Sequence, residues 1–308
     1  MPAITVDNLT KSFGQTLALD DLSFQVEEGE VFGFLGPNGA GKSTTINIVL
    51  DFARPTAGEV SVLGMDAQQH SRAIRQRTGV LPEGVQLYDR LTARQHLEFA
   101  IESKHADADP ERLLERVGLV DAIDKKAGGY SKGMAQRLML AMSLVGEPDL
   151  LILDEPSTGL DPNGAREMRD IVREENERGA TVFFSSHIME QVEAVCDRVG
   201  ILRDGEMVAV DSVEGLRDSV EGGTTLRVTV DRIDDDAMQA IRSLPDVSDA
   251  TVEDQNPPTI IVTVDGSKTA VLSALEDHGI EVQDFSTTEA SLDDVFQSYT
   301  TDAEVHAR

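Results

Sequence analysis

The stretch GPNGAGKST, from Gly36 to Thr44, constrains this chain more than any other part of its sequence. It matches the pattern G-x-x-x-x-G-K-[ST] and lies between the apolar run VFGFLG and a stretch that reads as a helix opening at Lys42. Glycines in such a loop let successive backbone N–H groups surround an anion, and the start of the next helix adds a positive dipole. The pattern predicts a nucleoside triphosphate site, with Lys42 on the β- and γ-phosphates and the Ser43 hydroxyl on Mg²⁺.

Two other buried strands end in polar residues. The run LLILDEP places Asp154 at the carboxyl end of a strand, followed by Glu155, and the run FFSSH ends in His187. Ligands of open α/β sheets bind at this edge, so we expect Asp154 to hold Mg²⁺, directly or through water, and Glu155 to take a proton from an attacking water. His187 would contact the γ-phosphate and orient that water. The alternatives are two acids that close a strand and a structural histidine.

The order of segments predicts two domains. Residues 1–220 alternate strand-like and helix-like segments, which favours an α/β layout around a buried sheet. Residues 221–300 read as β-α-β-β-α-β, the order of a small α+β ferredoxin-like unit, and EGG at 221–223 is a reasonable boundary. A last short helix, SLDDVFQSY, is expected after the strands, and residues 301–308 form a tail.

Charge is the extreme feature of the composition. The chain has 56 acidic and 27 basic residues, a net charge of -29, and the carboxylates are spread along its whole length. Such a surface suits either an acidic partner-binding protein or a cytosol of high salt, where the Debye length falls to about 3 Å at 1 M. The even spread favours the second, halophilic interpretation. The same charge argues against nucleic acid as a partner, because phosphate binding needs basic stripes.

The sequence shows no membrane-spanning or secretory segment and one cysteine. No run of 18 or more apolar residues occurs, and the start MPAITVDNLTKSFG lacks the layout of a secretory signal, so the chain is expected to be cytosolic. The single Cys196 excludes an internal disulfide. It lies in the apolar pattern AVCDRVGIL and is expected to be buried.

Five ordered motifs resemble a known family. GPNGAGKST, YSKGMAQR, LLILDEP, STGLDP and SSH occur in the order and approximate spacing of the ATP-binding cassette ATPases of ABC transporters, over residues 1 to about 215. The tail ending ASLDDVFQSY resembles the C-terminal extension of separate ATPase subunits similar to those of daunorubicin-type drug export and sodium export. The resemblance implies a P-loop NTPase of the α/β class, with a mixed sheet core and a helical subdomain at about 84–145.

The resemblance also assigns roles to single residues. Phe13 would stack on adenine, although a core Phe is the alternative, and Ser131 with the N–H groups at Gly133 would meet the γ-phosphate across a head-to-tail dimer. Asp161, in STGLDP, lies in the loop that crosses the dimer seam. The resemblance implies that Glu155 and His187 are catalytic and that Ser43, Glu83 and Asp154 bind Mg²⁺. The full set implied to contact ATP is Phe13, Gly36, Pro37, Asn38, Gly39, Ala40, Gly41, Lys42, Ser43, Thr44, Glu83, Ser131, Lys132, Gly133, Met134 and Asp161.

Three positions depart from the family pattern. Glu83 stands where most cassettes have Gln, and the nearby Gln86 is an alternative for that role. Lys132 and Met134 replace the usual Gly and Gln of the YSKGM motif, and the charge of Lys132 would offset that of Glu83. These departures concern the fine geometry of the site rather than the reaction.

The resemblance implies an ATPase subunit that binds two ATP in a homodimer, or in a dimer with a paralogous cassette. It would power a separate integral-membrane permease from the cytoplasmic face of the membrane, for export of a drug-like, lipid or ion substrate that the sequence does not name. The alternative is a soluble cassette ATPase acting on ribosomes or DNA, but those relatives usually carry two cassettes or a long coiled-coil insert. The C-terminal domain would strengthen dimerisation or sense a ligand.

Overall fold

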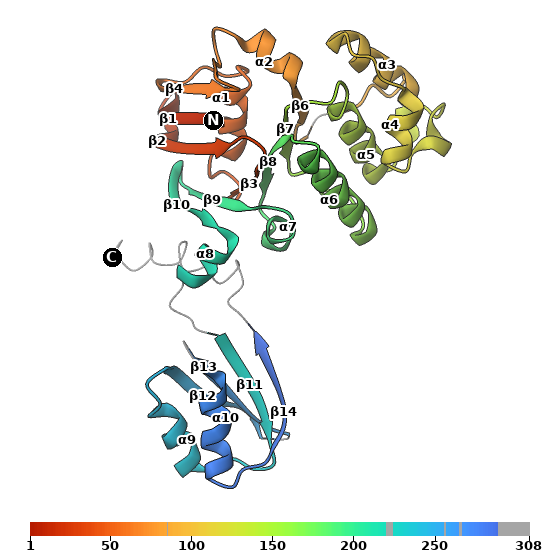
Figure 1. The fold of residues 1–308 in the computed structure, drawn as a ribbon. Helices are drawn as coiled ribbons and strands as arrows, with labels where there is room; N and C mark the ends of the chain where they lie inside the picture. The colour runs from red at the N-terminus through yellow and green to blue at the C-terminus, as the bar shows by residue number, and fades with distance from the viewer. Residues whose placement is uncertain (85, 220–223, 256, 265–266, 289–308) are drawn as a thin grey trace. The chain divides into compact units, whose positions relative to one another are not determined.

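The computed structural model describes residues 1–84, 86–219, 224–255, 257–264 and 267–288 (Figure 1). The expected glycine boundary at 221–223, the last short helix and the tail lie outside the described residues. Contacts divide the chain into a first unit, Met1–Val213, and a second unit, Glu214–Arg308. The division falls a few residues before the boundary at about 220 that the sequence suggests.

A six-stranded sheet, in the order β10-β9-β3-β8-β7-β6, forms the centre of the first unit. Five of its strands are parallel, and β10 is antiparallel to β9. β3, β7 and β8 are buried at every position, as expected of parallel strands covered on both faces. Their carboxyl ends therefore meet at one edge. The strands are β3 (Val31–Leu35), β6 (Thr78–Leu81), β7 (Leu150–Asp154), β8 (Thr181–Ser186), β9 (Arg198–Arg203) and β10 (Glu206–Ser212).

A second, antiparallel sheet packs against the first and makes the core mixed. Its order is β2-β1-β4-β5. Phe24 of β2 stacks on Phe32 and Phe34 of β3 and on Phe183 of β8, with ring centroids 5.4–6.2 Å apart. Helix α1 adds Ile46, Ile48 and Val49 to the same core. The elements are β1 (Pro2–Phe13), β2 (Thr16–Glu27), β4 (Ala57–Val62), β5 (Met65–Asp66), α1 (Lys42–Val49), α2 (Ser71–Arg77), α6 (Pro162–Glu177) and α7 (Met189–Glu193).

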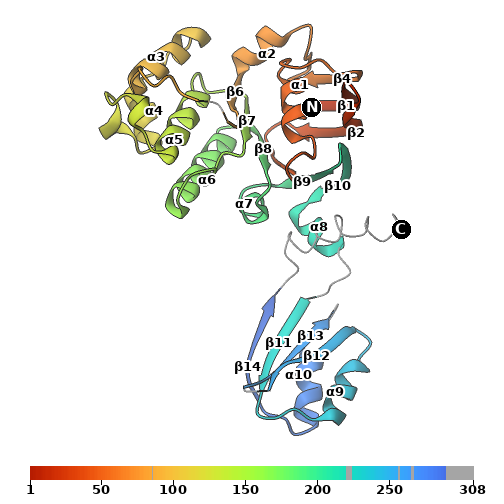
Figure 2. The same ribbon diagram turned by 180° about the vertical axis from the view of Figure 1, so that it is seen from behind.

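A group of helices lies beside β6 and away from the antiparallel sheet, in both views (Figures 1 and 2). Side-chain caps explain where these helices begin: Thr92 forms a capping box, Asp109 caps a helix that starts with Pro110, and Ser131 caps α5. The group occupies the stretch expected to form a helical subdomain. Its members are α3 (Ala93–Lys104), α4 (Pro110–Arg116), the 3-10 turns η1 (Val120–Ala122) and η2 (Ala127–Gly129), and α5 (Lys132–Ser143).

The second unit has the ferredoxin-like fold that the sequence predicts. Its sheet is antiparallel, in the order β12-β13-β11-β14, and it has its own core, which includes Leu226, Val228, Ile241, Val262 and Leu275. Alternate residues of β11 face that core, in agreement with the alternating pattern of TTLRVTV. The elements are β11 (Thr224–Val230), α9 (Asp235–Arg242), β12 (Val247–Gln255), β13 (Pro258–Val264), α10 (Lys268–Asp277) and β14 (Val282–Thr288), and α8 (Val213–Ser219) spans the division between the units.

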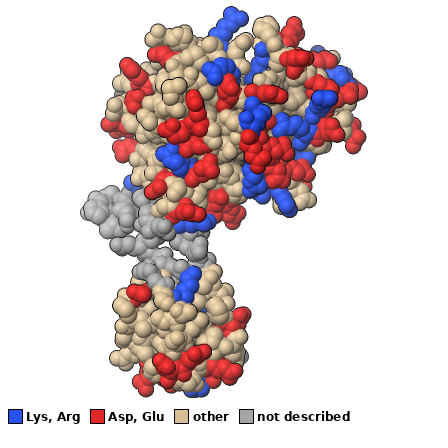
Figure 3. Space-filling view, in the orientation of Figure 1, with Lys and Arg blue, Asp and Glu red and all other residues tan. Residues whose placement is uncertain are grey.

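The surface and the single cysteine are as the composition suggests. Acidic side chains are spread over the visible face of both units (Figure 3). Cys196 is buried, as predicted, and burial raises the pKa of its thiol well above the ordinary value. Among the described residues, no helix combines the length and apolarity that a membrane span requires.

Candidate nucleotide-binding site

The loop Gly36–Thr44 leaves the carboxyl end of β3 and leads into α1. A Cβ at Gly36 would lie 2.6 Å from the carbonyl oxygen of Leu202, and Gly41 has φ +113° with Leu19 and the Ala18 carbonyl close by, so both positions need glycine. Gly41 caps α1 without a side chain, which leaves the first N–H groups of the helix available to an anion. The backbone is therefore shaped as the motif predicts.

Lys42 lies beneath this loop and is buried. Its Nζ donates to the carbonyl oxygens of Gly36 at 2.6 Å and of Pro37 at 3.3 Å. The same Nζ is 3.7 Å from Oε1 of Glu155. Lys42 thus joins the loop to the strand end that carries the predicted base.

Asp154 and Ser185 face each other across the neighbouring strands β7 and β8. Ser185 Oγ donates to Asp154 Oδ1 at 2.9 Å. Burial raises the pKa of the Asp154 carboxyl, the Ser185 hydrogen bond lowers it, and the negative charges of Glu83 and Glu155 raise it further. A cation at this edge would favour the ionised carboxylate.

Glu155 follows directly and is 3 % exposed. His187, which follows β8, places Nδ1 2.8 Å from Oε2 of Glu155, while Oε1 accepts no hydrogen bond from the described residues. The backbone of Glu155 has φ +49°, a conformation that non-glycine residues adopt only at a cost of about 1–3 kcal/mol. The site therefore holds a carboxylate with one oxygen oriented by an imidazole and the other without a donor.

The oxygen atoms present suit Mg²⁺. The described residues contain no cluster of three His, Cys, Asp or Glu that could hold a metal. Mg²⁺ in phosphate-transfer sites is usually bound by one or two protein oxygens, with substrate phosphates and waters completing its shell. The exposed Ser43 hydroxyl and the buried Asp154 carboxylate are donors of that kind. Oε1 of Glu155, which accepts no hydrogen bond from the described residues and lies 3.7 Å from Lys42 Nζ, is a further oxygen at the same edge.

The YSKGM motif forms the start of α5. Ser131 Oγ accepts a hydrogen bond from Met134 N at 3.2 Å, so Ser131 is the N-cap of this helix. Ser131 and Lys132 are exposed, and Gly133 and Met134 are partly buried. Asp161 caps a second helix, α6, by accepting from Gly164 N at 2.8 Å. Ser131 and Asp161 are both exposed, so the N-termini of α5 and α6 lie at the surface of the unit.

Phe13 ends β1 and is 54 % exposed, which excludes the alternative that it is a core residue. Its ring lies 4.6 Å from the Nζ of Lys11, which also donates to the carbonyl oxygen of Arg54 at 2.6 Å. An exposed aromatic ring of this kind has a face available for stacking on a base. Lys11 Nζ lies over one face of this ring, as in a cation–π contact.

Glu83 and Gln86, the two candidates for the role that Gln has in most cassettes, lie close to each other. Glu83 and Gln86 are both exposed, and both line one pocket of about 440 Å³ with Lys132, Gln136 and Glu155. The structure therefore brings two of the three departures from the family pattern, Glu83 and Lys132, close to the predicted base.

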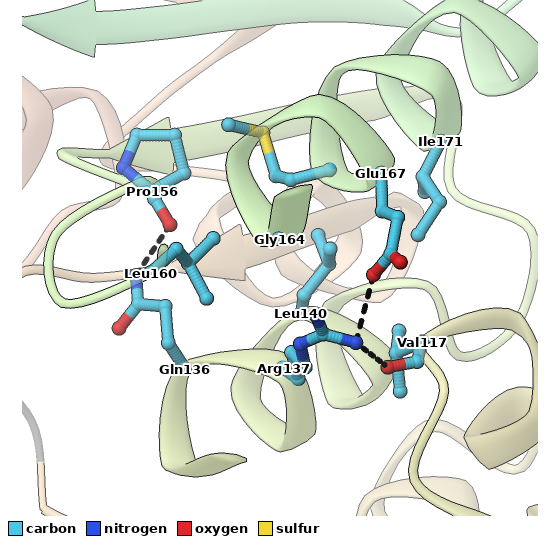
Figure 4. A pocket seen from close by; sticks show the side chains of 10 residues that line it. Val117, Gln136, Arg137, Leu140, Pro156, Leu160, Gly164, Glu167 and Ile171 are labelled. Atoms are coloured by element: carbon cyan, nitrogen blue, oxygen red, sulfur yellow. Dashed lines mark hydrogen bonds and ion pairs between the residues drawn. The ribbon is translucent and has the colours of Figure 1, made fainter. Parts of the chain in front are cut away.

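Some residues of the site escaped the sequence reasoning. Ser185, which donates a hydrogen bond to Asp154, is the first residue of the SSH triplet, but nothing in the triplet indicated this contact. Gln136 donates to the carbonyl oxygen of Pro156 at 2.8 Å (Figure 4). Its signal was its spacing of four residues from Lys132, which places both on one helix face. The hydrogen bond between Ser157 and Gln191 had no sequence signal.

Comparisons with protein families agree with the two units. The family model described as ABC transporter matches residues 19–158, and one described as ATP-binding protein DrrA1-3-like, C-terminal domain, matches residues 212–300. A third, described as an AAA domain, matches residues 126–192. The second match begins near the division between the units.

Curated relatives match nearly the whole chain. The linearmycin resistance ATP-binding protein LnrL of Bacillus subtilis is 34 % identical over 304 residues, which are 96 % of this chain and 98 % of that protein. The daunorubicin resistance ATP-binding protein DrrA3 of Streptomyces coeruleorubidus is 36 % identical over 97 % of this chain and 96 % of its own length. The bacitracin transport ATP-binding protein BcrA of Bacillus licheniformis is 40 % identical over 67 % and 68 %.

Solved structures match the first unit. An ATP-binding subunit of an ABC transporter has a TM-score of 0.65 and 30 % identity, over 70 % of this chain and 92 % of that one. A dimeric ATP-binding cassette in a post-hydrolysis state with ADP and phosphate has a TM-score of 0.63 and 25 % identity, over 68 % and 98 %. The chain has the phosphate loop and the strand-end acids, and it matches its relatives over nearly their full length. It therefore belongs to the ATP-binding ATPase subunits of ABC transporters.

Proposed function

We propose that this chain binds two ATP molecules in a head-to-tail dimer and that their hydrolysis powers a separate permease that exports its substrate. The observation that supports hydrolysis best is the contact of Glu155 with both His187 and Lys42 at the carboxyl edge of the sheet. Export is supported by the relatives, whose names concern resistance to linearmycin and daunorubicin and transport of bacitracin. The substrate class we propose is drug-like, lipid or ion.

In the proposed mechanism Lys42 and the N–H groups of the loop bind the β- and γ-phosphates. Oε1 of Glu155 accepts the proton of the attacking water, and His187 holds the carboxylate through Oε2 and contacts the γ-phosphate. Ser43, Asp154 and Glu83 would hold Mg²⁺, which neutralises phosphate charge when it is bound. Lys42 also stabilises the negative charge of Glu155 before the proton arrives.

The second half of each site would come from the other cassette, either a copy of this chain or a paralogue. The start of α5 is exposed at Ser131 and Lys132, so it would be free to contact a phosphate of the ATP bound to the other cassette. The loop at Asp161 would lie at the interface between the two cassettes. The dimeric solved structure of a cassette supports this arrangement. The ferredoxin-like unit would strengthen the dimer.

The permease would dock on the helical subdomain at 84–145, which places the chain on the cytoplasmic face of the membrane. Two large apolar side chains are exposed there, Tyr88 at 69 % and Phe99 at 62 %. They line a surface pocket of about 570 Å³ with Asp89, Arg90 and Leu91. Exposed apolar surface of this kind is typical of a protein contact. A helical segment of the permease is the occupant we propose.

The first test is to purify the Glu155→Gln variant with ATP from detergent-solubilised native membranes at high salt. We expect a polytopic membrane protein to copurify with it in near-equal amount. The Tyr88→Ala, Phe99→Ala double variant of the same protein should lose that partner and keep ATP binding. Phe285→Ala removes another exposed aromatic, in the second unit, and serves as the matched control. Recovery of ribosomal or DNA-bound proteins alone would contradict the transporter function and favour a soluble cassette ATPase.

The charge of -29 leads to a prediction about salt. We propose that the protein is adapted to a cytosol of high salt, because its carboxylates repel one another at low ionic strength. We expect the melting temperature to rise by about 5 °C or more as KCl rises from about 0.1 M to about 2 M, because the Debye length shortens over that range. Sucrose of equal osmolality is the control. An equal rise in sucrose would contradict the electrostatic origin.

A further inference from the structure

Helix α5 contacts, within the same subunit, the segment Pro156–Gly159 that follows Glu155. A Cβ at Gly159 would lie 2.6 Å from Cγ and Cδ of Lys132, and one at Gly133 would lie 3.2 Å from the Gly159 carbonyl oxygen. Gln136 lies one turn beyond Lys132 on the same face of the helix. This face of α5 is therefore fitted closely to the segment after the proposed base.

Gln136 makes a hydrogen bond from this face of α5 to the segment after Glu155. Its side chain is buried, at 8 % exposed, and its Nε2 donates to the carbonyl oxygen of Pro156 at 2.8 Å (Figure 4). Proline has no N–H, so this carbonyl is the only polar group of the Pro156 backbone. The amide of Gln136 therefore fixes the residue directly after Glu155 from a separate helix.

Glu155 needs such support because its backbone is strained. A φ of +49° persists in a non-glycine residue only where the surroundings impose it. On its N-terminal side, Glu155 N donates to the Ser185 carbonyl oxygen at 3.0 Å, and on its C-terminal side Thr158 N donates to the Glu155 carbonyl oxygen at 3.1 Å. The turn closed by Thr158 contains Pro156, whose carbonyl is the group that Gln136 holds.

We propose that Gln136 is a positioning residue for hydrolysis: its side-chain amide holds the Pro156 peptide and thereby aims the Glu155 carboxylate at the attacking water. This inference rests on the proposed role of Glu155 as the general base. The phosphate loop makes no part of this contact, so Gln136 acts on the chemical step and not on nucleotide affinity.

We expect Gln136→Met to lower kcat about tenfold, the factor that corresponds to one buried hydrogen bond, and to leave the Kd for ATP unchanged. Met keeps the length of the side chain and removes the donor. Gln136→Glu keeps the shape and turns an acceptor toward the Pro156 carbonyl, so its kcat should fall at least as far. Both are measured below the melting temperature of every variant. Full activity in Gln136→Glu would overturn the proposal.

Arg137→Met is the matched control on the same helix. Arg137 ties α5 to its surroundings through Glu167 at 2.8 Å and the Val117 carbonyl oxygen at 3.2 Å, but it does not bond the segment after Glu155 (Figure 4). Arg137→Met should lower the melting temperature and keep kcat within about twofold of the original, as expected of a partly exposed ion pair. An equal loss of kcat in Arg137→Met and Gln136→Met would show a general loosening of α5 and overturn the proposal.

A double-mutant cycle with Glu155 completes the test. In the Glu155→Gln background, single-turnover hydrolysis should be the same with and without the Gln136→Met substitution, because the group to be positioned is already lost. A further tenfold decrease in that background would overturn the positioning role. Rapid hydrolysis by Glu155→Gln alone would overturn the base assignment, whereas normal turnover of Gln136→Met beside an inactive Glu155→Gln would overturn this inference only.

Discussion

The Glu155→Gln variant should lose about 10²- to 10⁴-fold in kcat while it still binds ATP, because a general base contributes a factor of that size. Gln preserves the length of the side chain and its contact with His187, which lies 2.8 Å from Oε2. It cannot accept the proton of the attacking water. Steady-state ATPase assays give kcat, and equilibrium binding of a fluorescent ATP analogue gives affinity.

Glu147→Gln is the control for this experiment. Glu147 shares the left-handed backbone of Glu155, with φ +47° against +49°, but it is exposed and lies outside the site. The same change of charge at the same kind of backbone should leave kcat unchanged. Turnover of Glu155→Gln at a near-original rate would show that another group activates the water.

Lys42→Ala should weaken ATP binding about 10- to 100-fold, the range for one hydrogen bond to a charged group, and lower turnover as well. Lys42 is the cation that lies within the phosphate loop and beside Glu155, so its removal affects both binding and the base. Lys42→Arg should restore little, because a planar guanidinium does not fit where Nζ meets two carbonyl oxygens. Titration calorimetry with ATP and Mg²⁺ measures the affinity.

Lys104→Met provides the comparison. Like Lys42, Lys104 donates through Nζ to two carbonyl oxygens, of Thr78 at 2.9 Å and of Val145 at 3.2 Å. Burial lowers the pKa of the Lys104 ammonium. Its loss should lower the melting temperature and leave the Kd for ATP unchanged. If both lysine variants weakened ATP binding equally, the effect of Lys42→Ala would be one of stability rather than of phosphate contact.

The parts of the fold that follow from local patterns could be predicted from the sequence. The buried runs before Gly36 and up to Asp154 form parallel strands because each is short, apolar and closed by turn residues or acids. Caps such as Ser131 mark helix starts through their own side chains. The β-α-β-β-α-β order of the second unit follows from the succession of strand-like and helix-like segments along the chain.

Contacts between distant segments could not be predicted in this way. No local pattern places Gln136 against Pro156 or Ser185 against Asp154, because both contacts depend on how helix α5 and strand β8 pack on β7 and its loop. The positive φ of Glu155 is equally hidden, since glutamate has no preference for that conformation. The sequence also left Phe13 open between core and surface, which only its exposure decides.

The left-handed backbone at Glu155 has a practical consequence for engineering. Glycine or asparagine would fit this position with less strain, so replacements that relieve it are expected to make the protein harder to melt. A library selected for heat resistance alone would enrich inactive chains at this position. A useful screen has to reward phosphate release in the same round.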